Sequence, residues 1–174
     1  MGVDKATLEV DGETLARRAA RVLVAVCDPA IEIGPGASGL RVVREDPPGS
    51  GPLAALVAGV DALGTLPVVL LACDMPFVDV PLLSLVANHP GEGSVIAMAG
   101  GRAQYGCARY GATSIALARE ALERGERSFV RALSNDDGIT WLTPNQWGAV
   151  AAEHAFSDLD TPDDVSRFGF DGHR

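Results

Sequence analysis

The sequence predicts an α/β fold in which helices cover both faces of a mostly parallel sheet, and two features of the chain lead to this prediction. Segments with the spacing of amphipathic helices alternate with short apolar segments along the chain, which is the order of elements in α/β domains. One apolar segment, residues 68–73, contains no polar side chain except a cysteine thiol, as is typical of a strand buried on both faces. A length of 174 residues and a hydrophobic fraction of 47% fit a single domain over residues 1–174.

The elements of the first half follow from periodicity and from the positions of Pro and Gly. Apolar and basic residues at helical spacing predict the first helix, and the short apolar run at its end predicts a buried strand. Loops are expected where Pro and Gly gather, and Pro52 suits the first position of a helix. In chain order we expect a helix over 15–23, a strand over 22–26, a loop over 29–39, a strand over 41–43, a loop over 47–52 and a helix over 53–63.

The second half opens with the apolar strand 68–73, which stops at Asp74 and Pro76. A Gly100-Gly101 pair predicts a tight turn between two strands, and Gly125 predicts the end of a long amphipathic helix. In chain order we expect a helix over 80–87, strands over 94–99 and 104–110, a helix over 113–124, one or two helical turns over 128–133, a turn over 135–138, a strand over 139–142 and a helix capped at 161–164 that runs through Phe168.

Charge and cysteine usage exclude several classes of function. Fourteen Lys and Arg against 23 Asp and Glu give a net charge of −9, which disfavours binding to nucleic acid or to anionic membranes. Cys27, Cys73 and Cys107 lie far apart without neighbouring histidines, so we expect neither a disulfide framework nor a zinc site. The N-terminus lacks a signal-peptide pattern, and no apolar run approaches a membrane span. We therefore expect a cytoplasmic protein.

Asp74 is the first candidate for chemistry because it follows the apolar strand directly. In open α/β sheets, ligands bind at the carboxyl ends of the strands. A carboxylate at this edge suits Mg²⁺, which takes one or two carboxylates and completes its shell with water and substrate phosphates. The alternative is a structural role, in which Asp74 caps the helix that begins near Val80 or bonds its own turn.

Two further carboxylates, Asp158 and Asp160, are spaced two residues apart. On an extended segment they point to the same side, where they could complete a metal site with Asp74. The alternative is again structural, because Asp160 or Thr161 is a good N-cap ahead of Pro162.

Lys5 is the only lysine of the chain, and a compact ammonium on a flexible stem is a common phosphate ligand. A solvated surface position is the alternative. The loop 49–52 leads directly into a helix, whose free N–H groups could meet an anionic or polar ligand. This loop lacks the Gly-Lys-Ser/Thr of a P-loop, and no nucleophile motif accompanies the three histidines.

Four motifs in order resemble those of the nucleotidyltransferases related to molybdenum cofactor guanylyltransferase. The chain carries Met-Gly-Val-Asp-Lys-Ala at 1–6, Gly-Pro-Leu-Ala at 51–54, Cys-Asp-Met-Pro-Phe at 73–77 and Asp-Leu-Asp-Thr-Pro-Asp-Asp at 158–164. The resemblance implies a Rossmann-like three-layer α/β fold. It also implies transfer of GMP from Mg²⁺-GTP to the terminal phosphate of molybdopterin, with release of pyrophosphate.

The resemblance also implies roles for individual residues. Lys5 and Asp74 would be catalytic and would contact the nucleotide, and Asp74 would hold the metal with Asp160. The start of the helix after the second loop, Gly51, Pro52 and Leu53, would complete the nucleotide site. Asp158 and Asp160 would line the active site, where the guanylyltransferases often carry Asn. The acceptor side is expected at Gln104, Tyr105, Arg127 and Asp158. A phosphate monoester is already anionic at neutral pH, so alignment and charge neutralisation by Lys5 and Asp74 suffice without a histidine base.

The resemblance predicts a missing element as well. In this family an apolar strand and a Leu-Ala-Gly-Gly-x-Ser-x-Arg loop precede the Met-Gly pair, which stands at residues 1 and 2 of this chain. We therefore expect the first central strand and the phosphate-cradling loop to be missing, most simply because Met1 is an internal methionine of a longer protein. A chain authentic as given would leave two strand edges without partners. We expect such a chain to be weakly stable or to pair these edges with another chain.

Two other interpretations are open at this point. The enzyme could use CTP, or an acceptor such as a sugar phosphate, an isoprenoid precursor or phospholactate, because sister enzymes share much of the motif pattern. The chain could also be a non-catalytic relic that keeps the fold and binds a partner without the phosphate loop.

Overall fold

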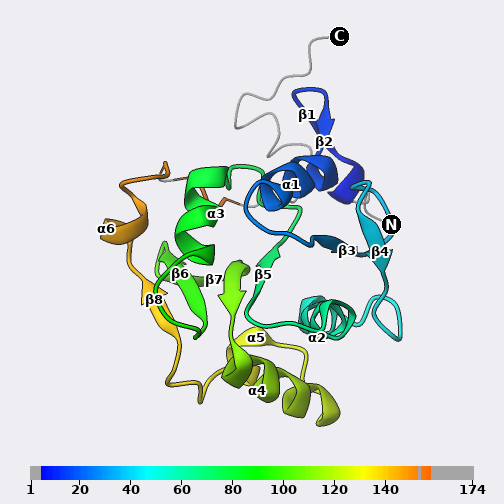
Figure 1. Ribbon diagram of the computed structural model, residues 1–174, viewed down its shortest axis with the longest axis vertical. Coiled ribbons are helices and arrows are strands. Elements are labelled where there is room, and N and C mark those ends of the chain that lie inside the picture. Colours follow the sequence, from blue (N-terminus) through cyan, green and yellow to red (C-terminus); the bar gives the residue numbers. More distant parts are fainter. Residues whose placement is uncertain (1–4, 153, 158–174) are drawn as a thin grey trace.

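Strands and helices alternate along the chain in the computed structural model, which describes residues 5–152 and 154–157 (Figure 1). In chain order the elements are η1 (Lys5–Thr7), β1 (Glu9–Val10), β2 (Glu13–Thr14), α1 (Leu15–Val24), β3 (Ile31–Ile33), β4 (Arg41–Val43), α2 (Pro52–Leu63), β5 (Val68–Leu71), α3 (Val80–Ala87), β6 (Val95–Ala99), β7 (Arg102–Tyr110), α4 (Ala112–Glu123), α5 (Phe129–Ala132), β8 (Thr140–Leu142) and α6 (Pro144–Trp147). The α/β class expected from the sequence is confirmed.

The largest sheet has the strand order β5-β7-β6-β8 and is mixed. β7 runs antiparallel to both β5 and β6, whereas β6 and β8 are parallel. The expectation of a mostly parallel sheet is therefore wrong for these four strands. The cause is the turn at Gly100 and Gly101, whose φ angles of 56° and 73° let β7 fold back on β6 as a hairpin and take the place beside β5.

Three short strands and two short helices, η1 and α6, were not expected from the sequence. β3 lies within the expected loop 29–39 and pairs in parallel with β4, with Ile31 opposite Arg41, while β1 and β2 form a small antiparallel pair. The strand expected over 22–26 is wrong. Its first residues belong to α1, which Thr14 caps, and the N–H groups of Val26 and Cys27 both donate to the carbonyl of Leu23 in a closing turn. The short helix α6 was also missed.

The helices lie on both sides of the sheet and complete a three-layer arrangement (Figure 1). α2 and α4 pack together on one side, where α5 joins them, and α1 and α3 pack together on the other. Each side has its own apolar core, one around Leu53 and Tyr110 and the other around Leu82 and Cys107.

Several boundaries agree closely with the sequence. α3 covers the expected residues 80–87 because Asp79 caps its first turn, and α4 ends just ahead of Gly125, which has a φ of 80°. The terminal helix expected after Thr161 lies outside the described residues. Among the helices described here, none has the length and apolar character required to cross a membrane.

Candidate active site

Asp74 lies at the carboxyl end of β5, where the sequence placed it. The N–H of Ala72 donates to the carbonyl of Gly106 at 2.7 Å, and the N–H of Met75 then turns back to the carbonyl of Ala72 at 3.4 Å. Met75 is only 8% exposed, so its side chain anchors the loop in the core while the Asp74 side chain stays 27% exposed. The capping role belongs to Asp79, whose Oδ1 accepts from the N–H of Leu82 at 3.0 Å. This leaves Asp74 available for a ligand.

Lys5 and Asp74 are 69 residues apart in the sequence, and their side chains lie next to each other in the fold. The Lys5 Nζ lies 3.4 Å from Asp74 Oδ2, and the lysine side chain is 42% exposed. The short helix η1 that carries it is held by the N–H of Leu8, which donates to the Lys5 carbonyl, and by the N–H of Leu15, which donates to the carbonyl of Leu8. Leu15 is fully buried in a small cluster that Phe77 joins. The same cluster therefore supports both the lysine and the loop that follows Asp74.

Two residues that support this loop were not singled out from the sequence. Arg18 of α1 donates from Nε to the carbonyl of Pro76 at 2.8 Å. Gly106 lies under the loop, where an added Cβ would come within 3.0 Å of Met75 Cε and 3.1 Å of Ala72 Cβ. Three arginines fall within 17–21, and only the tertiary fold shows which of them reaches Pro76.

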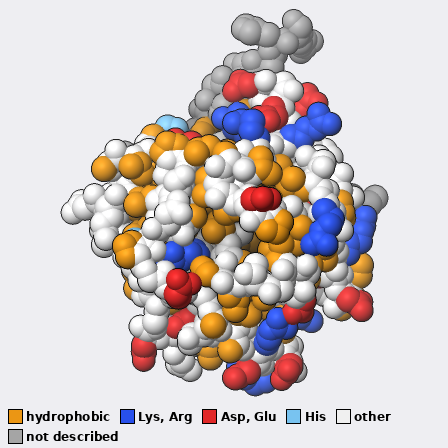
Figure 2. All heavy atoms as spheres, viewed as in Figure 1, with side chains coloured by type: hydrophobic (Ala, Val, Ile, Leu, Met, Phe, Trp, Pro, Cys, Tyr) orange, Lys and Arg blue, Asp and Glu red, His pale blue; other side chains and the backbone are white. Residues whose placement is uncertain are grey.

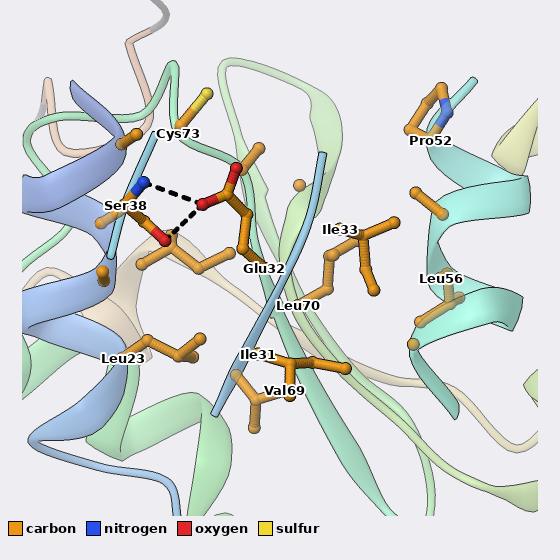
Figure 3. Close-up of a pocket in the computed structure, with 18 of the residues that line it drawn as sticks. Leu23, Ile31, Glu32, Ile33, Ser38, Pro52, Leu56, Val69, Leu70 and Cys73 are labelled. Atoms are coloured by element: carbon orange, nitrogen blue, oxygen red, sulfur yellow. Dashed lines mark hydrogen bonds between the residues drawn. The ribbon is translucent and has the colours of Figure 1, made fainter. Parts of the chain in front are cut away.

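A cavity of about 510 Å³ opens beside Asp74. It lies between β3 and β5, with α1 on one side and α2 on the other, and Figure 3 shows Leu23 and Leu56 facing it from these helices. Its walls are mainly apolar, and Figure 2 shows hydrophobic side chains gathered on this face between the two helices. Asp74 and Pro52 both line it, so the cavity links the strand end to the start of α2.

Glu32 is the acidic side chain at the middle of the cavity wall (Figure 3). Its carboxylate accepts the N–H groups of Gly36, Ala37 and Ser38 and the hydroxyl of Ser38. Burial acts to raise the pKa of Glu32, but these hydrogen bonds outweigh it and hold the pKa below the ordinary value. Glu32 thus fixes the loop after β3 and is fully engaged in doing so.

The start of α2 contributes backbone groups to the site. Gly51 precedes the helix with a φ of 92°, Pro52 takes its first position, and no side chain caps the first turn. Leu53 as a whole is 0% exposed in the core, and of the three residues at this helix start only Pro52 lines the cavity. Unpaired N–H groups at a helix start favour anionic or polar ligands.

The residues expected on the acceptor side are partly brought to the cavity. Tyr105 stacks on Phe129 with ring centroids 5.4 Å apart, and Phe129 lines the cavity. Desolvation raises the pKa of the Tyr105 hydroxyl. Gln104 donates to carbonyls of the β6–β7 turn, and Arg127 is exposed ahead of α5. Neither is among the described residues that line the cavity.

Asp158 and Asp160 lie outside the described residues. Four residues before Asp158 in the sequence, His154 packs its ring edge-on against Phe77, with the ring centroids 4.9 Å apart. Phe77 is three residues after Asp74 in the sequence. Over 5–152 and 154–157, no group of three His, Cys, Asp or Glu side chains converges as a metal site. Asp74 alone still fits Mg²⁺, because that ion needs as little as one protein carboxylate when substrate phosphates supply further ligands.

Comparisons with known proteins agree with this geometry. A family model described as the MobA-like NTP transferase domain matches residues 1–137. A probable molybdenum cofactor guanylyltransferase of Opitutus terrae is 34% identical over 142 residues, covering 75% of this chain and 70% of the relative. A protein with the same description from Chloroflexus aggregans is 27% identical over 179 residues, covering 94% of this chain and 85% of the relative.

Solved structures show the same fold. The crystal structure of molybdopterin-guanine dinucleotide biosynthesis protein A from Archaeoglobus fulgidus superposes with a TM-score of 0.79 at 17% identity, covering 95% of this chain and 89% of that one. A nucleotidyl transferase from Methanothermobacter thermautotroptrophicus gives a TM-score of 0.71 at 21% identity, covering 95% and 83%.

Proposed function

The chain belongs to the MobA-like NTP transferase family, and from this premise we propose that it transfers GMP from Mg²⁺-GTP to the phosphate of a molybdopterin-type acceptor. The products are a guanine dinucleotide form of the cofactor and pyrophosphate. One observation supports this most directly: Lys5 and Asp74, from distant parts of the sequence, meet at 3.4 Å at the carboxyl end of β5. The names of the relatives support the choice of GTP and acceptor.

For this reaction the protein has mainly to align the two substrates and to neutralise the charge of their phosphates. An oxygen of the acceptor phosphate attacks the α-phosphorus of the nucleotide, and the bond between that phosphorus and the β-phosphate oxygen breaks. The acceptor oxygen is already deprotonated, because the second pKa of a phosphate monoester is about 6. No side chain therefore has to remove a proton, which agrees with a site built from one ammonium and one carboxylate.

Lys5 neutralises phosphate charge in this proposal. Its side chain is 42% exposed and has a flexible stem, so the ammonium can turn from Asp74 to a phosphate oxygen without rearrangement of the backbone. Asp74 would hold Mg²⁺, which when bound stabilises negative charge on the phosphates. At the uncapped start of α2, the N–H groups of Gly51 and Leu53 would receive a polar group of the nucleotide. Pro52 has no N–H to donate and would contribute only the wall of the site, which it lines.

Asp158 and Asp160 are proposed as further acidic residues at the site. The contact between His154 and Phe77 supports this, since it brings the chain four residues before Asp158 beside the Asp74 loop. Four extended residues span up to about 13 Å. Tyr105, Gln104 and Arg127 are proposed for the acceptor side, and the stacking of Tyr105 on a cavity residue supports the first of them best.

Calorimetric titration with GTP, CTP and ATP, each with and without Mg²⁺, tests the proposal. We expect selective binding of GTP that requires Mg²⁺ and that is lost in Asp74→Asn. Preference for CTP would assign the chain to a cytidylyl-transferring branch. A folded chain that binds none of the three nucleotides would contradict the proposal and favour a non-catalytic role.

A further inference from the structure

Tyr105 is the most exposed ring in a stack of three aromatic side chains. Its ring and that of Phe129 are stacked with centroids 5.4 Å apart and 5° between their planes, and Phe129 also stacks on Tyr110 at 5.7 Å and 19°. Exposure falls along the stack, because Tyr105 is half-buried whereas Phe129 is 8% exposed and Tyr110 is 0% exposed. The two buried rings hold the Tyr105 ring in a fixed orientation and leave part of its surface open.

A bulge in β7 turns Tyr105 toward Phe129. The pairing of β6 with β7 shifts its register between Ile96 and Met98, so β7 bulges between Ala103 and Ala108. Strict alternation along a strand would place residues 105 and 108 on opposite faces of the sheet. Both nevertheless pack with the same core. Bulges next to functional sites commonly redirect a side chain in this way.

Tyr105 belongs to the strand on the side of β5 away from the proposed nucleotide site. β7 lies on one side of β5, and β3 and α2 lie on the other (Figure 1). The N–H of Ala72 donates to the carbonyl of Gly106 at 2.7 Å, which places Tyr105 across from the start of the Asp74 loop. Paired strands are about 5 Å apart, so these two segments are immediate neighbours.

This placement agrees with the geometry of the proposed reaction. In phosphoryl transfer the attacking and leaving oxygens lie roughly in line, on opposite sides of the phosphorus. The acceptor therefore approaches from the side opposite the pyrophosphate. With the nucleotide at Lys5 and the start of α2, the β7 side of Asp74 is the side from which the acceptor would approach.

We propose that Tyr105 binds the acceptor by stacking its ring on the flat pyrimidine ring of the pterin. The inference rests on the proposed function, because it concerns the acceptor of that reaction. Aromatic side chains bind flat heterocycles through their ring faces, and a ring already held by Phe129 loses little freedom when a ligand stacks on it. The guanine of GTP is also a flat heterocycle, so GTP is the competing ligand in the test.

Binding of hydroxymethylpterin phosphate to Tyr105→Leu tests the proposal. Leu keeps an apolar side chain against Phe129 but has no ring face. We expect its Kd for the pterin phosphate to rise about ten-fold, as is usual when a ring under a base is removed, and its Kd for Mg²⁺-GTP to stay unchanged. Tyr105→Phe keeps the ring and should bind both ligands as the wild type does. The matched control is Trp141→Leu, which removes a 43% exposed ring from β8 and should change neither affinity.

Tyrosine NMR of the wild-type protein gives a second measurement that does not depend on the folding of a variant. The chain contains two tyrosines, so isotope-labelled tyrosine gives separate signals for Tyr105 and Tyr110. The ring current of a stacked pterin should move the Tyr105 ring signals upfield as the ligand saturates the protein. Tyr110 is 0% exposed and should move much less.

Three results would overturn the proposal. They are equal pterin affinity in wild type and Tyr105→Leu, no pterin binding by the wild type, and a loss of GTP affinity as large as the loss of pterin affinity. The last result would show that the ring binds the nucleotide base or only supports the fold. Normal GTP binding with an unchanged pterin affinity in Tyr105→Leu would overturn the stacking alone. A wild-type protein that binds the pterin through Tyr105 but binds no nucleotide would instead contradict the proposed function.

Discussion

Replacing Asp74 by Asn tests whether its carboxylate acts in catalysis or only stabilises the fold. Asn keeps the size of the side chain and removes its charge, so the variant loses the ion pair with Lys5 and the carboxylate that is proposed to hold the metal. On the proposed function we expect Mg²⁺-dependent pyrophosphate release to fall by about 100-fold or more, the usual effect of removing a group aimed at transition-state charge. We expect stability to change little.

The small stability effect follows from the geometry of the pair. Unit charges 3.4 Å apart attract by about 1 kcal/mol in water and about 5 kcal/mol at an effective dielectric constant of 20. With side chains 42% and 27% exposed, solvent screening and the entropy of fixing a lysine reduce the net value to about 0–1 kcal/mol. For a chain of 174 residues, this corresponds to a decrease in Tm of at most about 4 °C.

The matched control is Asp79→Asn, which removes the same charge five residues further along the chain. Asn caps a helix about as well as Asp, so this variant should keep both activity and stability. Pyrophosphate release and urea unfolding would be measured on both variants. Undiminished release by Asp74→Asn would refute the catalytic assignment. A loss of about 3 kcal/mol or more in its free energy of unfolding would refute the argument from exposure.

Three further predictions follow from the hydrogen bonds and burial of individual side chains. Arg18→Met removes the bond to the Pro76 carbonyl, so pyrophosphate release should fall several-fold with a stability loss of about 1 kcal/mol, whereas Arg17→Met, at an exposed position, should change neither. Arg109 is 4% exposed and donates to four main-chain carbonyls; its replacement by Met should lower the free energy of unfolding in urea by about 2–4 kcal/mol, and wild-type stability would contradict this. Burial raises the pKa of the Cys107 thiol from 9.0 to about 12, so its stabilising effect is complete below pH 9.0 and is lost as the pH rises toward 12. Unfolding free energies measured across this range should therefore decline less steeply for Cys107→Ala, and parallel slopes would show that the thiol does not contribute.

Local signals in the sequence were sufficient for most elements of the main sheet and its helices. The bounds of α3 could be predicted because a cap at Asp79 precedes a helical pattern. The β6–β7 hairpin could be predicted because two glycines separate two segments with strand character. The place of Asp74 followed from an abrupt polar residue after an apolar strand. In each case the signal lies within a few residues of the element that it predicts.

The errors arose where contacts distant in sequence decide the structure. β3 lies among Pro and Gly residues, and its loop is ordered by the carboxylate of Glu32, which no periodicity reveals. The run 22–26 is apolar enough for a strand, but packing of α1 against α3 keeps its first residues helical. The mixed sheet depends on β7 taking the place beside β5, a choice of partner that turn residues alone cannot specify.

On the proposed function, the local charges around Lys5 and Asp74 matter more to a bound metal nucleotide than the net charge of the chain. The net charge is −9, yet screening over about 8–10 Å at cellular salt concentration means that only nearby groups act on a bound phosphate. Among the described residues beside the cavity these are the ammonium of Lys5, the carboxylates of Asp74 and Glu32, and the start of α2, which has no acidic residue in its first turn. The Glu32 carboxylate is already bonded to the loop after β3. As long as the ammonium is paired with the carboxylate, the two charges cancel. A divalent ion on Asp74 would compete with Lys5 for the carboxylate, and an ammonium released in this way can bind a phosphate. On the proposed function, metal and nucleotide therefore strengthen each other's binding through this one ion pair.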